Sequence, residues 1–171
     1  AITGWTAAAN VTAGTNANRK LGATAVTLTP AAGFTTGKMA YKAIAGGGTQ
    51  DFSAYTKINL WFRPTTSAAF NASDLRICLC SDTTGDVVVN GLNFPATLPS
   101  TSWNCLVLDY GAALSASVQS VAIYANVDPG TVVLVFNNIF AANNDLSLQT
   151  LIGKSDDVNY NIQSIDGTTI K

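Results

Sequence analysis

The chain has 171 residues and a net charge of −1, with 11% charged and 47% hydrophobic residues. Its nine basic residues are scattered, which argues against nucleic-acid binding, and no apolar run approaches the ~20 residues needed to span a bilayer. The absence of His excludes His-based catalytic triads and His metal sites, while the length suits one domain with its own core.

Short alternating segments between Gly, Pro and Asp turns predict β-strands along most of the chain. Lys57–Arg63 (KINLWFR) and Leu75–Ser81 (LRICLCS) are the clearest, because every second residue is apolar. In Gly37–Ile44 the same alternation predicts Met39 and Tyr41 on one face of a strand, with Lys38 and Lys42 on the other. The strands expected before residue 117 are Ala23–Thr29, Gly37–Ile44, Lys57–Arg63, Leu75–Ser81, Val87–Val89 and Trp103–Tyr110, and one helical turn is expected in Gly111–Ser117.

The most apolar stretch of the chain is Ser117–Ala142. It predicts two long strands, Val118–Val127 and Thr131–Phe140, joined as a hairpin by a type II turn at Asp128-Pro129-Gly130. A hairpin this apolar needs a second sheet to cover it, and the remaining strands supply one. The pattern therefore predicts an all-β fold: an antiparallel two-sheet β-sandwich of jelly-roll type.

The character of the chain changes after residue 144. We expect the jelly-roll domain to occupy residues 1–144 and a C-terminal arm to occupy residues 145–171. Asp166-Gly167 in the arm is a type I′ hairpin signal. The arm is predicted either to make assembly contacts or to be a loose terminus, and its contact residues would be the apolar side chains Ile162, Ile165 and Ile170.

The three cysteines are Cys78, Cys80 and Cys105. Cys78 and Cys80 share one face of a predicted strand, and a Cys-x-Cys pair with one distant Cys and no His is a poor zinc set. We expect buried free thiols, with a bridge from Cys105 to either of the other two as the alternative.

The distribution of the acids argues against an enzyme. A glycosidase needs two carboxylates flanking a cleft, whereas the Asp residues here fall at turns, strand ends and the tail. A glycan-binding surface is the other chemical possibility: Trp61 with Arg63 forms an aromatic platform, and Arg76 and Tyr124 are expected beside it on the same sheet. The alternative is that Trp61 packs under a loop.

The order of motifs (DFSAYTKINLWFR, LRICLCSD, WNCLVLDY, VQSVAIYANVDPGTVVLVFNNIFAA) resembles the carbohydrate-binding-module-like β-jelly rolls of tailed-bacteriophage structural proteins. The resemblance covers roughly residues 5–142. It implies a non-enzymatic virion protein, which would be one of three kinds: a capsid decoration (cement) protein, a head fibre or a tail-fibre module. Such a protein would be a homo-oligomer on the particle surface, with other virion proteins as partners. The alternative function is a secreted carbohydrate-binding module that recognises glycans.

One departure from this family concerns calcium. Many sugar-binding rolls of this type hold a structural Ca²⁺ with N-terminal acids and an Asp in the final strand. Here Asn137 stands in that strand, and no acid precedes Asp51. Calcium prefers several oxygens with net negative charge. No cofactor is therefore expected, with a calcium site through Asn137 and backbone carbonyls as the alternative.

Overall fold

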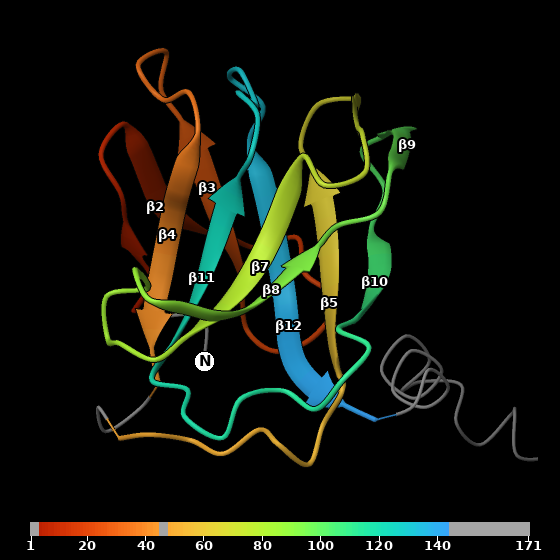
Figure 1. Ribbon diagram of the computed structural model, residues 1–171. Coiled ribbons are helices and arrows are strands. Elements are labelled where there is room, and N and C mark those ends of the chain that lie inside the picture. Colours follow the sequence, from red (N-terminus) through yellow and green to blue (C-terminus); the bar gives the residue numbers. More distant parts are fainter. Residues whose placement is uncertain (1–3, 45–47, 144–171) are drawn as a thin grey trace, which may run out of the picture.

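The computed structural model describes residues 4–44 and 48–143, and these form a two-layer β-sandwich (Figure 1). The order β1-β4-β11-β7-β8 makes the front sheet, and the order β10-β5-β12-β3-β2 makes the back sheet. All strand pairs in both sheets are antiparallel. The strands are β1 (Thr6–Ala7), β2 (Val11–Asn16), β3 (Ala25–Pro30), β4 (Gly37–Ala43), β5 (Lys57–Pro64), β6 (Ala68–Phe70), β7 (Leu75–Cys80), β8 (Val88–Asn93), β9 (Thr97–Ser100), β10 (Asn104–Asp109), β11 (Ser120–Ala125) and β12 (Leu134–Ala142).

The predicted sandwich of jelly-roll type is confirmed, and its core lies between the two sheets. Phe62 of β5 lies at the centre of an aromatic cluster, with ring centroids 5.3 Å from Phe136 and 5.5 Å from Phe94. Phe136 belongs to the back sheet, whereas Phe94 directly follows β8 of the front sheet. The cluster therefore joins the two layers, and all three rings are buried.

The predicted hairpin in Ser117–Ala142 is wrong. β11 pairs with β4 and β7 in the front sheet, while β12 pairs with β3 and β5 in the back sheet. The chain does turn here, but not as the predicted type II turn: the Val132 N–H donates to the Pro129 carbonyl at 3.3 Å, so Gly130, with a φ of 62°, is the first central residue of the turn and not the second. The Asp128 carboxylate accepts the Gly130 N–H at 2.7 Å. The segment between the strands thus carries the chain from one sheet to the other.

Other local expectations need smaller corrections. Residues 111–117 are bends and irregular backbone, not a helical turn. The strand predicted at Val87–Val89 begins one residue later, at Val88, and continues to Asn93 as β8. The part of the chain that the structure describes contains no helix that could cross a membrane. The predicted arm with Ile162, Ile165 and Ile170 lies outside the described residues.

Candidate functional site

The four residues predicted to bind a glycan lie on two different sheets. Trp61 and Arg63 belong to β5 of the back sheet, and Arg76 and Tyr124 belong to β7 and β11 of the front sheet. Their neighbours along each strand are buried in the core, so all four side chains point away from it, on opposite outer faces of the sandwich. The expectation of one shared sheet is therefore wrong, and the structure brings together Trp61 with Arg63 and, separately, Arg76 with Tyr124.

On the back sheet, loop residues contact the indole rings of Trp61 and Trp103. The Lys20 ammonium lies 4.9 Å from the centre of the Trp61 ring, and the Arg63 guanidinium lies 5.6 Å from the Trp103 ring. The Trp103 Nε1–H donates to Asn18, and Arg63 Nη1 donates to the carbonyl of Thr101 at 3.1 Å. Both rings are only half-exposed. Trp61 is thus a packed side chain with a lysine over its ring instead of an open platform.

Asn137 of β12 fixes one of these loops. Its Oδ1 accepts the N–H groups of Lys20 and Leu21, and its Nδ2 donates to the carbonyls of Leu21 and Thr24, at 2.8–3.3 Å. The orientation of the amide is determined by its partners, because two donors face its oxygen and two acceptors face its nitrogen. A cation does not fit beside an oxygen at which two N–H groups already point, so this arrangement does not suit calcium. The described residues also contain no group of three or more His, Cys, Asp or Glu side chains able to hold a metal.

The front sheet presents a row of four outward side chains in register across four adjacent strands. Lys38 of β4 is opposite Tyr124 of β11, Tyr124 is opposite Arg76 of β7, and Arg76 is opposite Asn93 of β8. We call these four residues the cross-strand row. It extends over three strand spacings of ~4.8 Å, or about 14 Å.

Arg76 and Tyr124 form the centre of the cross-strand row. The Arg76 guanidinium lies 4.9 Å from the centre of the Tyr124 ring, a cation–π contact. Burial raises the pKa of Tyr124 to about 12, with contributions from the Cys80 and Cys78 thiols and from Asp86 that outweigh the effect of Arg76. The phenol is therefore neutral near pH 7 and donates to the Gly85 carbonyl at 2.7 Å.

A β-bulge places Lys38 in this row. β4 and β11 shift register between Ile123 and Tyr124, so Met39 is an extra residue and both Met39 and Ala40 are buried. As a result Lys38 and Tyr41 share the outer face, with the Lys38 ammonium 5.0 Å from the Tyr41 ring. The alternation predicted for this segment, with Met39 and Tyr41 on one face, is therefore wrong.

The loop 82–87 folds back over one end of the front sheet. It covers a small buried cluster of Cys78, Cys80 and Ala122, and Lys38 forms an ion pair with Asp86. Burial raises the pKa of Cys78 to about 11 and that of Cys80 to about 12. No disulfide joins the three cysteines, all of which are described by the structure, and Cys105 lies on the back sheet, so the alternative of a bridge to Cys105 is wrong.

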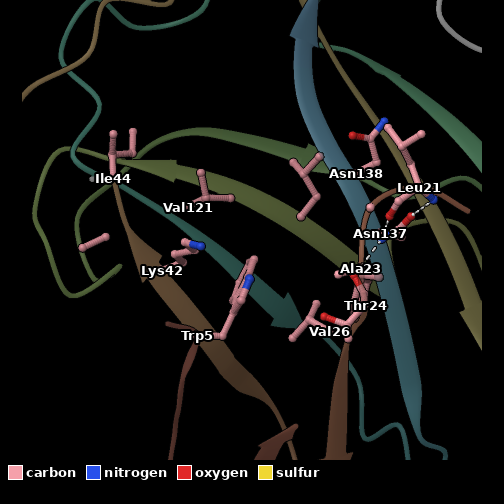
Figure 2. Close-up of a pocket in the computed structure, with 14 residues that line it drawn as sticks. Trp5, Leu21, Ala23, Thr24, Val26, Lys42, Ile44, Val121, Asn137 and Asn138 are labelled. Carbon is pink, nitrogen blue, oxygen red and sulfur yellow. Dashed lines mark hydrogen bonds between the residues drawn. The ribbon is translucent and has the colours of Figure 1, made fainter. Parts of the chain in front are cut away.

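A pocket of about 500 Å³ opens between the sheets (Figure 2). Figure 2 shows Trp5, Lys42 and Val121 on one side of it, with Val26 and Thr24 on the other. Lys42 is its one charged lining residue, and most other lining side chains are small or apolar. The pocket therefore suits a small apolar group better than a polar polymer.

Sequence reasoning missed Lys38 and Asn93 as members of a site. Asn93 is exposed and lies beyond the predicted strand Val87–Val89, and Lys38 was predicted on the face opposite Met39 but not on that of Tyr41, with which it shares the outer face. The signal that identifies them is the strand register, which local alternation does not contain.

No family model matches the chain, and no curated protein is similar enough to match. Solved structures are similar to it in fold. An arabinose-bound GH51 α-L-arabinofuranosidase matches with a TM-score of 0.57 at 18% identity over 81% of this chain and 23% of its own. A family 11 carbohydrate-binding module from Clostridium thermocellum, in complex with a β-1,3-1,4-mixed-linked tetrasaccharide, matches with a TM-score of 0.54 at 12% identity over 84% of this chain and 91% of its own.

A further similar structure is the CBM22-1–GH10 part of C. thermocellum endo-1,4-β-D-xylanase 10B complexed with xylohexaose, with a TM-score of 0.52 and 13% identity. It is matched over 84% of this chain and 27% of its own. The chain thus spans about a quarter of the length of the two enzymes and nearly all of the free-standing module. These similarities establish the fold: a β-sandwich jelly roll of the carbohydrate-binding-module type.

Proposed function

We propose that the chain is a carbohydrate-binding module that holds a glycan across the outer face of the front sheet. The observation that carries this proposal is the cross-strand row, in which an aromatic ring, a guanidinium and an amide stand in register on neighbouring strands. A sugar ring has an apolar C–H face and a rim of hydroxyls. Planar donors such as Arg76 and Asn93 bind the hydroxyls, and the Tyr124 ring, against which the Arg76 guanidinium already lies, orients Arg76 instead of packing on the sugar.

The open end of the front sheet favours this face over the others. Asn93 and Gly91 are exposed beside Arg76, whereas the loop 82–87 binds Lys38 and the Tyr124 hydroxyl in the other half of the row. On the back sheet, Lys20 lies over Trp61 and loops hold Trp103, and the pocket between the sheets offers few polar side chains. The proposed action is binding without catalysis, because nothing in the row supplies the pair of carboxylates that glycoside hydrolysis requires.

The test is glycan binding by the purified chain, with one variant on each face. We expect the wild type to bind a β-linked oligosaccharide on an array and by calorimetry. Asn93→Ala removes an exposed amide without disturbing the core and should weaken binding about 5- to 10-fold, the effect of one or two hydrogen bonds. Trp61→Ala on the back sheet is the matched control and should leave the affinity within about twofold. Absence of glycan binding in the wild type, or loss of binding in Trp61→Ala alone, would contradict the proposal.

The virion functions implied by the resemblance remain separate predictions. Capsid decoration or a head- or tail-appendage role, homo-oligomerisation and contacts with other virion proteins are implied by the resemblance, which covers roughly residues 5–142. The arm at residues 145–171 is the segment predicted to make the assembly contacts. A light-scattering mass for the chain with and without Ser147–Lys171 tests them, since an assembly arm requires an oligomer that becomes monomeric on truncation.

A further inference from the structure

Arg76 has no hydrogen-bonding partner within the described residues. Its Nε is buried and makes no hydrogen bond, and no carboxylate lies within ion-pairing distance. Arg19 donates to the carbonyls of Ala17 and Gly22. Arg63 also has a buried Nε without a partner, but its Nη1 donates to the carbonyl of Thr101, whereas no nitrogen of Arg76 has an acceptor among the described residues. A guanidinium carries five N–H donors in a fixed fork, and leaving them without acceptors is unfavourable. The outer N–H groups of Arg76, a half-buried residue, are therefore available to an acceptor from outside the described chain.

The acids near the front sheet are already engaged. Asp86 pairs with Lys38, and the Asp82 carboxylate accepts the N–H groups of Thr84, Asp86 and Val87. Asp74, two residues before Arg76, accepts the Asn71 N–H at 2.7 Å. Arg76 therefore has no direct ion pair with a described acid, whereas Lys38, at one end of the row, is paired with Asp86.

The surroundings of Arg76 leave one side of the guanidinium open. Tyr124 lies against it at 4.9 Å, which orients the planar group. On the neighbouring strand lies Gly91, where an added Cβ would be 3.7 Å from Arg76 Nη1, so the absence of a side chain lets the guanidinium lie over this exposed glycine. The exposed amide of Asn93 stands opposite Arg76 and adds both a donor and an acceptor.

We propose that Arg76 binds the carboxylate of an acidic sugar, so that the glycan recognised by the cross-strand row contains uronic acid residues. A carboxylate is planar and accepts two parallel N–H groups from a guanidinium fork, a geometry that a hydroxyl cannot reproduce. Tyr124 holds the fork in place, and Asn93 binds hydroxyls of the same sugar. This inference rests on the proposed glycan-binding function and specifies the class of glycan.

The experiment compares two oligosaccharides of equal length and β-linkage: a β-1,4-linked oligoglucuronate and the neutral oligosaccharide obtained by reducing its carboxylates. Titration calorimetry with the full chain should give an affinity about 10- to 100-fold higher for the acidic one, the effect of a charge-assisted bidentate contact. Arg76→Gln should remove this preference, and its loss of affinity for the neutral oligosaccharide, which has only hydroxyls to offer Arg76, should be the smaller one, about 5- to 10-fold. Arg63→Gln, the same substitution on the back sheet and outside the cross-strand row, should retain the preference and serves as the matched control.

The outcomes separate the inference from the function on which it rests. Equal binding of the acidic and neutral oligosaccharides would overturn the inference and leave the glycan-binding function standing, whereas binding of neither would overturn both for this class of polymer. A preference that survives Arg76→Gln, or that appears only with a sulfated oligosaccharide, would also overturn the inference. Circular dichroism and thermal unfolding of each variant establish that it is folded before its affinity is compared.

Discussion

The side-chain amide of Asn137 binds both backbone polar groups of Leu21. Its Oδ1 accepts the Leu21 N–H at 2.8 Å, and its Nδ2 donates to the Leu21 carbonyl at 3.1 Å. The same amide binds Lys20 and Thr24, so one buried side chain on β12 holds the loop that lies over the back sheet (Figure 2). The two residues are 116 positions apart, and they line the same pocket.

Removing this amide should destabilise the domain. Asn137→Ala leaves two N–H groups and two carbonyls of the loop without their partner, and we expect a loss of about 2–4 kcal/mol in the free energy of unfolding. Urea denaturation measures it. Asn104→Ala is a suitable control, because the Asn104 amide reaches only the carbonyl of Ser102, two residues away, and its loss should cost less than about 1 kcal/mol. Equal losses in the two variants would contradict the role given to Asn137.

Calcium should not affect the stability of the wild type. Because two N–H groups occupy the Asn137 oxygen, neither added Ca²⁺ nor a chelator should shift the midpoint of thermal unfolding. Asn137→Asp should behave differently. Its second carboxylate oxygen would replace the Asn137 Nδ2 donor and face the carbonyl oxygens of Leu21 and Thr24. These oxygens repel one another, and a bound cation would remove the repulsion by coordinating all three. We therefore expect Asn137→Asp to be less stable than the wild type and to regain stability when Ca²⁺ is added. A calcium-dependent midpoint in the wild type would contradict this interpretation.

The strands were largely predictable because alternation is a local property. Lys57–Arg63 and Leu75–Ser81 were each predicted to within one residue of β5 and β7, since buried and outward side chains alternate along both. The sheet to which each strand belongs was not predictable in this way. The Asp128-Pro129-Gly130 turn signals a change of direction in the chain, but the same turn serves a hairpin or a passage between two sheets.

The candidate site was harder to predict, because it depends on register between distant segments. The four residues of the cross-strand row come from positions 38, 76, 93 and 124, and one extra residue in β4 decides that Lys38 faces outward. A bulge adds one residue to a strand, so every side chain beyond it lies on the opposite side of the sheet from the one that simple alternation predicts. The sequence pattern alone does not show where a bulge occurs. Arg76 and Tyr124 were identified from the sequence as potential glycan-binding residues, but their contact with each other was not.

Gly85 should be required for the loop 82–87 to close over the front sheet. Its φ is 76°, and a Cβ at this position would lie 2.8 Å from Tyr41 Cβ and 3.0 Å from Ala122 Cβ. Gly85→Ala should therefore cost about 2–4 kcal/mol, the sum of an unfavourable left-handed backbone and an overpacked contact. Gly130→Ala separates the two effects: its φ is 62° but nothing lies within 4 Å, so only about 1–2 kcal/mol should be lost. Chemical denaturation of both variants tests this, and an equal cost would show that the contact with Tyr41 is unimportant.

Stability should fall in acid because of Asp82. Its partial burial raises the pKa, but hydrogen bonds from the Thr84 hydroxyl and from the N–H groups of Val87, Asp86 and Thr84 outweigh burial and hold the pKa of Asp82 well below its ordinary value. The folded state thus binds a proton less readily than the unfolded state. The stabilisation is complete above the unfolded pKa of ~4 and is lost progressively as the pH falls below it.

Thermal unfolding followed from about pH 7 down to pH 2 measures this dependence. Asp82→Asn, which cannot titrate, should be less stable than the wild type at neutral pH and should show a shallower decline in acid. Asp51, Asp86 and Asp109 also have lowered pKa values through their hydrogen bonds, so part of the decline should remain in the variant. An unchanged slope would exclude Asp82 as a contributor.

The thiols beneath the loop 82–87 should be unreactive in the folded protein. The thiolate is the nucleophile, and burial raises the pKa of Cys78 to about 11 and that of Cys80 to about 12, so both remain protonated near pH 8. Cys105 is only half-buried, on the other sheet. Brief treatment with iodoacetamide should therefore modify at most Cys105 in the native chain and all three cysteines in denaturant, as counted by mass spectrometry. Gly85→Ala should raise the modification of Cys78 and Cys80, because a displaced loop uncovers them. Two or more modified thiols in the native wild type would contradict the burial of this pair.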